Sequence, residues 1–99
     1  MAIAMSLQWP GLTPDQYDAV RARVRWEEEP PDGAVLHGAW FKPDGLHVFD
    51  IWDSEEQFQR FIAEKIMPAV KEVGIEGEPQ TQISPLHRRF VAPGVTGAA

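Results

Sequence analysis

The 99-residue sequence contains no cysteine, which excludes disulfide bonds, thiol catalysis and cysteine-ligated metal sites. No apolar run approaches the roughly 18 residues that a membrane-spanning helix needs. The first residues, MAIAMSLQWPG, lack a positively charged start and break at Pro10, which argues against a signal peptide. We therefore expect a cytoplasmic protein with no membrane partner.

Basic residues are also scarce, since 9 Lys and Arg face 15 Asp and Glu and give a net charge of -6. Binding to nucleic-acid phosphates needs a basic patch. The only positive clusters are Arg21, Arg23 and Arg25 and the pair Arg88–Arg89. Arg21 and Arg25 lie at the C-terminal end of an expected helix, where cations complement the helix dipole. The sequence therefore predicts no nucleic-acid partner.

Motifs of several enzyme classes are missing as well. There is no Ser-His-Asp order, no phosphate-binding glycine loop and no dinucleotide fingerprint. The three histidines do not follow the i,i+4 or His-x-His spacing of metal sites. We expect neither a metal nor an organic cofactor.

Capping signals predict two helices. Thr13 and Gln16 form a capping box before a helix over 14–25, and Ser54 begins a second helix. The apolar stripe of the second helix runs to Gly74, and Pro68 should kink or split it near residues 66–67.

Strands precede and follow these helices. Residues 2–7 suit a first strand, and residues 81–91 suit a last strand, which Pro85 places at a sheet edge or a bulge. The small, Gly- and Pro-rich residues at the end predict a flexible tail over 92–99, after a single domain over 1–91.

Residues 34–52, AVLHGAWFKPDGLHVFDIW, read as a β-hairpin. Pro43 and Asp44 suit the centre of a type I turn, and Gly45 suits its close. In a symmetric turn, His37 lies opposite Asp50 on one face, next to a pair between positions 35 and 52. A three-residue loop with a bulge would move His37 out of this register.

The resulting order is βαββαβ, which predicts a ferredoxin-like α+β fold with an antiparallel sheet and two helices on one face. Both faces of the hairpin are substantially apolar. In an antiparallel sheet with one face in water, apolar and polar residues should alternate along each strand. Because two helices cover only one face, we expect a second copy of the chain on the other, in a homodimer.

The segment HVFDIWDSEEQFQRF, the element order and the late strand with His87 resemble the dimeric α+β barrel superfamily. This superfamily includes antibiotic-biosynthesis-monooxygenase-like and stress-responsive barrel proteins. The resemblance covers roughly residues 2–90 and implies a homodimer whose facing sheets form a barrel, with a small-molecule pocket in each subunit. Some members are cofactor-independent oxygenases acting on polycyclic phenols; others degrade haem, isomerise or cyclise small molecules, or have no known reaction.

Two of these activities do not transfer by position. Haem-degrading members use an asparagine in the first strand and a histidine in the second helix, but this chain has no asparagine and no histidine between Glu55 and Val73. The asparagine, tryptophan, tyrosine and arginine set of the quinone-forming members cannot be placed on this sequence either.

His37 and Asp50 are the candidate catalytic residues. Side chains opposed across an antiparallel pair are close enough to hydrogen-bond. The carboxylate would fix the imidazole tautomer and raise its basicity, leaving the other nitrogen to remove a substrate proton. The alternative is a purely structural polar pair that helps to set the sheet register.

Trp52 beside this pair, Val35, Phe58 and His87 are the candidate substrate-binding residues. On a fourth strand, His87 would lie about 14 Å from His37. Within one subunit it would join the site only if side chains reach across a pocket, whereas across a dimer it could join directly. The alternative role for His87 is an interface histidine on an edge strand.

Two functions stay open at this point. One is a small enzyme without metal or cofactor that acts on an aromatic or polyketide-type molecule by proton abstraction or oxygenation, which the His37/Asp50 pair favours. The alternative is a non-catalytic dimeric binding or accessory module, which the missing asparagine favours. In either case, the partner is a small hydrophobic or aromatic molecule.

Overall fold

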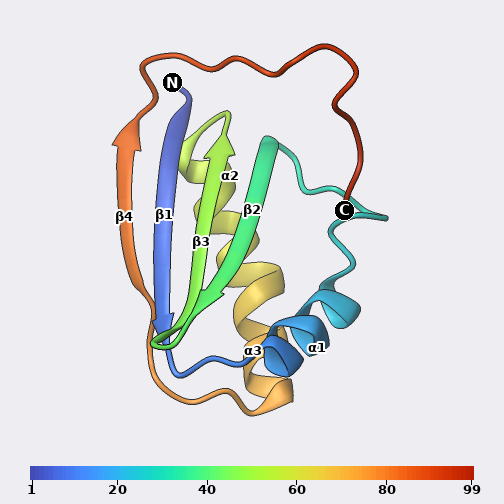
Figure 1. The fold of residues 1–99 in the computed structure, drawn as a ribbon, viewed down its shortest axis with the longest axis vertical. Helices are drawn as coiled ribbons and strands as arrows, with labels where there is room; N and C mark the ends of the chain where they lie inside the picture. The colour runs from blue at the N-terminus through green and yellow to red at the C-terminus, as the bar shows by residue number, and fades with distance from the viewer.

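The computed structural model describes all residues from Met1 to Ala99 and confirms the order βαββαβ (Figure 1). The strands form one antiparallel sheet in the order β2-β3-β1-β4. Their bounds are β1 (Ile3–Pro10), β2 (Ala34–Lys42), β3 (Gly45–Trp52) and β4 (Gln80–Pro85). The helical segments are α1 (Pro14–Val24), α2 (Glu55–Phe61), η1 (Ile62–Ile66) and α3 (Met67–Val73). The predicted ferredoxin-like fold is correct.

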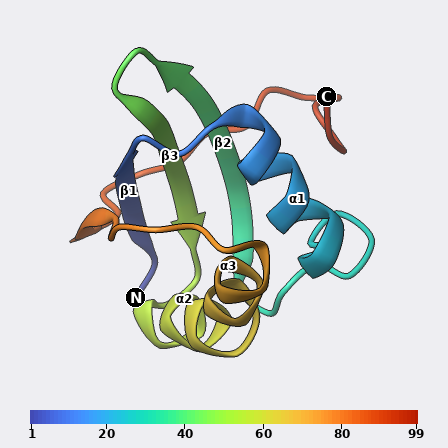
Figure 2. The same cartoon turned by 90° about the horizontal axis from the view of Figure 1, so that it is seen from below.

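One face of the sheet is covered by helices and the other is open. Figures 1 and 2 show the segment from α2 to α3 behind the sheet, with α1 beside it next to β2. The buried core lies between these layers and is built from apolar side chains of both, namely Ile3, Met5, Trp9, Leu12, Val20, Leu46, Val48, Trp52, Phe58, Ala69 and Val70. No helix combines the length and the apolar character needed to cross a bilayer.

The helix termini follow the capping signals closely. Thr13 Oγ1 accepts a hydrogen bond from the Gln16 amide (3.2 Å), and Gln16 Oε1 accepts one from the Thr13 amide (3.0 Å). The first helix ends one residue before the expected boundary, because Arg25 adopts a left-handed conformation (φ 59°) as the C-cap. Ser54 Oγ caps α2 by accepting from the Gln57 amide at 3.2 Å.

The second helical segment is divided, as Pro68 predicts. Proline has no amide hydrogen for the i−4 carbonyl, and its ring crowds that carbonyl. The chain responds with one π-helical stretch, η1, after which the Met67 amide donates to the Ile62 carbonyl. Short π segments often occur at functional sites, and both Ile62 and Ile66 line the cavity described below.

The hairpin has the predicted register over most of its length. Lys42 pairs with Gly45, and His37 pairs with Asp50. The expected pair between Val35 and Trp52 is wrong, because a bulge between Ala34 and Leu36 leaves Val35 unpaired and brings Ala34 opposite Trp52. An extra residue on one strand shifts every pair beyond it by one position.

The last strand is shorter than the sequence suggested. It ends at Pro85 and not at Val91, so the expectation that His87 lies on this strand is wrong. β4 is an edge strand, as proline requires, and after Pro85 the Leu86 amide still donates to the Ala2 carbonyl at 2.9 Å. The strand ends here because its partner β1 begins at Ile3, so the residues after Leu86 have no strand beside them. Residues 86–99 contain no helix or strand; Figure 1 shows them crossing above the sheet and returning toward the loop between α1 and β2. The flexibility of residues 92–99 stays a prediction.

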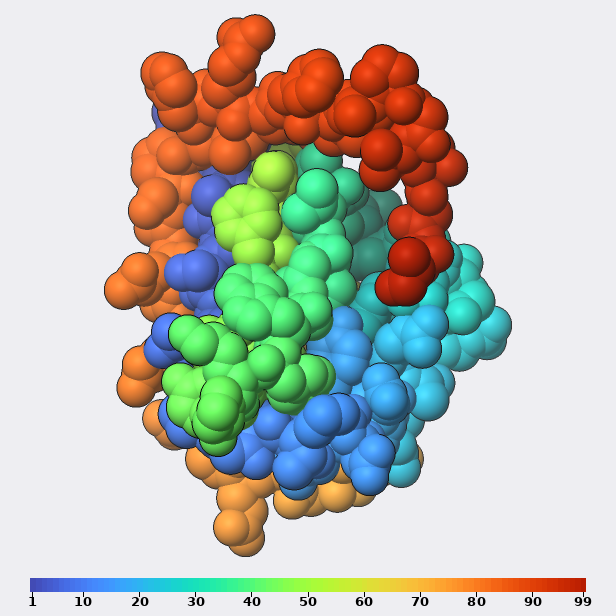
Figure 3. Space-filling model, in the orientation of Figure 1, coloured from blue at the N-terminus to red at the C-terminus, as the bar shows by residue number.

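The open face of the sheet has an apolar half and a polar half. On β2 and β3 it presents Trp40, which is 48% exposed, and Phe49, which is 38% exposed. On β1 and β4 the same face carries Ser6, Gln8, Gln80, Gln82 and Ser84, as the strand register requires. Figure 3 looks onto this face; the C-terminal segment (red) borders its upper and right rim and leaves the strands uncovered.

Candidate functional site

A cavity of about 400 Å³ lies between the helical layer and the covered face of the sheet. Its volume falls in the range of small-molecule sites, which are mostly apolar with a few placed polar groups. Its most buried wall consists of apolar side chains, among them Met5, Trp9, Val48, Phe58 and Val70. The titratable lining residues are only four: Tyr17, Glu27, His37 and Asp50.

His37 and Asp50 form the predicted hydrogen-bonded pair. His37 Nδ1 lies 2.7 Å from Asp50 Oδ1, because the two residues are direct partners on β2 and β3. The second carboxylate oxygen of Asp50 accepts a hydrogen bond from the Trp52 indole at 3.0 Å. The Asp50 side chain is 10% exposed and the His37 side chain 34% exposed, so the imidazole reaches toward the cavity mouth while its carboxylate lies beneath it. The predicted geometry is confirmed; the catalytic roles stay predictions.

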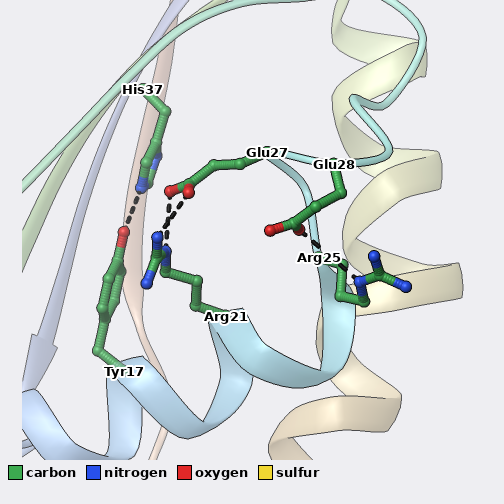
Figure 4. A network of polar contacts seen from close by, with 6 residues as sticks. All are labelled: Tyr17, Arg21, Arg25, Glu27, Glu28 and His37. Carbon is green, nitrogen blue, oxygen red and sulfur yellow. Dashed lines mark hydrogen bonds and ion pairs between the residues drawn. The ribbon is translucent and has the colours of Figure 1, made fainter. Parts of the chain in front are cut away.

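Tyr17 completes this network, and sequence reasoning missed it. Its hydroxyl reaches from α1 to His37 Nε2 at 2.7 Å (Figure 4). Since the Asp50 carboxylate only accepts, His37 Nδ1 carries the hydrogen and Nε2 accepts from the hydroxyl. Burial raises the pKa of Tyr17 to about 12, and the Asp50 charge adds to this rise. The signal that could have indicated Tyr17 is its residue type, because a tyrosine on the core-facing side of a helix needs a partner for its hydroxyl.

Aromatic rings hold Tyr17 and His37 in place. The Trp26 ring packs edge-on against both, at centroid distances of 5.7 Å and 5.4 Å. The Phe41 ring packs edge-on against Tyr17 from β2 at 6.1 Å. The Tyr17 and imidazole planes are nearly parallel, at 3°. The hydroxyl and the imidazole are thus positioned by packing as well as by their hydrogen bond.

An ion pair borders the same network. Arg21 Nε donates to Glu27 Oε2 at 2.8 Å, next to Tyr17 and His37 (Figure 4). This hydrogen bond lowers the pKa of Glu27. Glu27 lines the cavity and Arg21 does not, so the cavity wall contains two carboxylates and neither an arginine nor a lysine.

Three of the four predicted substrate-binding residues line the cavity, and the fourth does not. Trp52, Phe58 and Val35 all line the cavity, and the rings of Trp52 and Phe58 pack 5.6 Å apart. His87 does not line it and lies beyond the end of β4. Two residues that the sequence did not indicate, Gly97 and Ala98, reach the cavity from the C-terminal segment.

The remaining histidine is away from the cavity. His47 Nε2 bonds to Asp44 Oδ1 at 2.9 Å and its ring stacks on Trp40 at the open face of the sheet. This contact lowers the pKa of Asp44. No group of three or more His, Asp or Glu side chains is arranged to hold a metal ion.

No protein-family model matches the chain, and no curated protein matches it. Solved structures do match. A protein of unknown function from Nitrosomonas europaea is 18% identical with a TM-score of 0.68, over 94% of this chain and 96% of that one. A mutant of SnoaB, a cofactor-independent oxygenase from Streptomyces nogalater, is 15% identical with a TM-score of 0.61, over 90% of this chain and 95% of that one. A dimeric ferredoxin-like protein of unknown function from Thermobifida fusca is 13% identical with a TM-score of 0.62, over 87% and 92%.

The chain shares the fold of these proteins. Two putative antibiotic biosynthesis monooxygenases, from Chloroflexus aurantiacus and Deinococcus radiodurans, have it as well. The predicted resemblance to antibiotic-biosynthesis-monooxygenase-like and dimeric ferredoxin-like proteins is therefore correct at the level of the fold. Since all these identities lie at or below 18%, they establish the fold alone.

Proposed function

We propose that this protein is a homodimeric enzyme without a metal or organic cofactor, which takes a flat aromatic or polyketide-type molecule into its cavity and removes a proton from it. His37 is the base in this proposal, and Asp50 orients it. The observation that carries the proposal is the Asp50–His37–Tyr17 network at the partly exposed end of a mostly apolar cavity.

The distribution of polar groups supports a flat, largely apolar ligand. The inner wall offers the rings of Trp9, Trp52 and Phe58, which are 2–4% exposed. Rings of this kind bind aromatic molecules by stacking and edge contacts. The partly exposed end offers His37 and Tyr17. A ligand would therefore place its rings inside and its ionisable group at the mouth.

The proposed chemistry begins with one proton. An acidic C–H proton, whose loss leaves an anion that a conjugated carbonyl group stabilises, passes to the imidazole, and the positive charge formed on His37 faces the Asp50 carboxylate. The ligand anion can then donate electrons directly to dioxygen and form a C–O bond. The resulting peroxide takes back the proton and loses water, so that CH2 and O2 become C=O and H2O. The likeness in fold to the cofactor-independent oxygenase SnoaB supports this second stage.

Anthrone, a flat three-ring ketone with one acidic CH2 group, tests the proposal. The wild-type protein should convert anthrone to anthraquinone and consume one molecule of dioxygen for each product molecule. His37→Gln should slow this conversion by roughly 100-fold, the lower end of the range for loss of a general base.

His47→Gln is the matched control, because His47 is a buried histidine bonded to an aspartate outside the cavity. It should retain the wild-type rate. Equal rates for His37→Gln and the wild type would remove His37 from the chemistry.

The homodimer in this proposal uses the open face of the sheet. Trp40 and Phe49 lie there without a cover, and apolar surface of this kind marks an interaction site. The dimeric state of the Thermobifida fusca protein supports the same assembly here. Light scattering should give about 22 kDa, twice the chain mass of 11.1 kDa.

A non-catalytic binding module is the second candidate. It is favoured by one specific observation: Tyr17 already occupies Nε2 of His37, the nitrogen that a general base would turn to its substrate. In this case the wild-type protein would bind anthrone, and no variant would alter the slow oxidation seen without protein.

A further inference from the structure

We infer that Tyr17 is the residue that contacts the ionisable group of the ligand, and that its hydroxyl passes a proton from a ligand oxygen to His37. This inference rests on the proposed function and deepens it. It assigns a further catalytic residue and specifies the ligand as a neutral phenol or the enol form of a ketone.

Both nitrogens of His37 are already engaged. Nδ1 bonds to Asp50 Oδ1 and Nε2 bonds to the Tyr17 hydroxyl, each at 2.7 Å. A ligand could reach Nε2 directly only by displacing Tyr17. That displacement would separate its ring from Trp26 and Phe41, which pack against it edge-on, and would leave Nε2 without its donor. A ligand that bonds to the Tyr17 oxygen avoids this cost.

The Tyr17 oxygen can accept such a bond. A phenolic hydroxyl donates one hydrogen bond and keeps lone pairs that accept others. Its own hydrogen points to His37, so a ligand O–H can donate to it from the cavity. Tyr17 also provides the only side-chain hydroxyl of the cavity wall, since no serine or threonine lines it.

The transfer balances without an external reagent. The ligand O–H proton moves to the Tyr17 oxygen while the Tyr17 proton moves to His37 Nε2. Tyr17 ends neutral, the ligand carries the negative charge and the imidazolium faces Asp50. Because burial raises the pKa of Tyr17 to about 12, its hydroxyl regains a proton from the ligand and no tyrosinate accumulates. No atom is oxidised or reduced.

The charges around the cavity define the ligand class further. Asp50 and Glu27 line the cavity, and neither an arginine nor a lysine does. A carboxylate, sulfonate or phosphate group would meet like charges there, which is unfavourable in a poorly hydrated site. The ligand therefore enters neutral and becomes an anion only after the proton has moved. Removing the O–H proton of an enol gives the same anion as removing the CH proton of its ketone.

The probe for this inference is 2-hydroxyanthraquinone, whose phenolate absorbs at longer wavelength than the phenol. Wild-type protein should lower the pH of half-deprotonation of the bound probe by about one unit, which is a tenfold change in its ionisation constant. Tyr17→Phe removes one oxygen and keeps the ring, and His37→Gln removes the acceptor. Both should bind the probe, measured by quenching of tryptophan fluorescence, and both should lose the shift. His47→Gln should keep it.

A second test changes the ligand and leaves the protein intact. 2-Methoxyanthraquinone has no hydrogen to donate to Tyr17 and should bind about tenfold more weakly than the hydroxy compound. In Tyr17→Phe the two compounds should bind alike. This comparison does not depend on how well any variant folds relative to the others, since its main arm uses the wild type.

The failures can be told apart. If Tyr17→Phe keeps the full shift and His37→Gln loses it, the relay through Tyr17 is wrong and His37 acts directly, as the proposed function alone states. Equal binding of the hydroxy and methoxy compounds to the wild type would also overturn the relay. If neither compound binds the wild type, the proposed function fails and the relay fails with it.

Discussion

Replacing Asp50 by asparagine should lower the stability of the protein moderately and the rate of the proposed reaction strongly. Asp50 accepts hydrogen bonds from His37 Nδ1 at 2.7 Å and from the Trp52 indole at 3.0 Å, and it is 10% exposed. Asparagine has the same shape but one oxygen and one NH2 group. Its oxygen can keep the Trp52 bond, while its NH2 group must donate to His37.

This rearrangement forces the other tautomer on His37. Nδ1 becomes the acceptor, Nε2 carries the hydrogen and the Tyr17 hydroxyl turns from donor to acceptor. All partners of the network keep a bond, so no buried polar group is left unpaired. However, Nε2 can no longer take a proton from Tyr17, and the proposed reaction should slow by roughly 100-fold or more.

The loss of stability should be moderate. Two hydrogen bonds to a charged group, worth about 1.5–3 kcal/mol each, become neutral bonds worth about 0.5–1.5 kcal/mol. The bond to His37 contributes the smaller change because the imidazole is 34% exposed. We expect a loss of about 2 kcal/mol in the free energy of unfolding, which lowers Tm by about 8–16 °C in a domain of this size.

Urea unfolding, followed by tryptophan fluorescence, measures this loss, and Asp53→Asn serves as the control at a neighbouring exposed aspartate. Asp50→Ala should cost at least 1 kcal/mol more than Asp50→Asn, because it leaves the buried Trp52 N–H without a partner. If Asp50→Asn unfolds at the wild-type urea concentration, the two hydrogen bonds are not charge-assisted and the reasoning is wrong.

Three further predictions concern other parts of the molecule. Tyr17 is the only tyrosine, so absorbance at the tyrosinate band reports it alone; it should titrate at about pH 12 in the folded protein and near its ordinary value of 10.0 in urea. Because the pKa of Tyr17 is higher in the folded state, its contribution to the free energy of unfolding should be fully present below pH ~10 and should be lost as the pH rises toward 12. A folded-state titration near 10 would contradict the burial of the hydroxyl. In light scattering, Trp40→Glu should convert an assembly of about 22 kDa to the 11.1 kDa monomer. The control Phe90→Glu, at a site 82% exposed in the C-terminal segment, should stay a dimer. Dimers in both variants would exclude the open sheet face as the interface. Gly45→Ala should lower the free energy of unfolding by about 2 kcal/mol or more in urea titrations, because Gly45 has φ +128° and a Cβ atom would lie 2.4 Å from the Trp9 carbonyl oxygen; a wild-type midpoint would show that this turn relaxes freely.

Much of the fold could be predicted because its signals are local. The capping residue Thr13 and the turn through Pro43 and Asp44 act over a few positions, and the structure contains both features. The register of the hairpin follows from its turn, which is why His37 and Asp50 could be paired in advance. The bulge at Val35 could not be predicted in this way, because it depends on how the end of β2 meets the rest of the sheet.

The site was predicted only in part because half of its network spans distant segments. Tyr17 and His37 are 20 residues apart and come from a helix and a strand, so no spacing rule connects them. His87 was placed on β4 because its surroundings resemble a strand, but the partner strand β1 begins at Ile3 and leaves the residues after Leu86 without a strand beside them. Gly97 and Ala98 carry no chemical signal at all, and they reach the cavity only through the path of the chain.

The destination of the ligand proton can be observed directly. Nitrogen-15 NMR of the histidine side chains can follow both ring nitrogens of His37 while 2-hydroxyanthraquinone is added, at a pH where the free probe is a neutral phenol. We predict that the bound probe becomes the phenolate and that His37 alone becomes an imidazolium, with His47 and His87 unchanged. A bound probe that stays a neutral phenol, or a phenolate beside an unchanged His37, would show that His37 does not receive the proton.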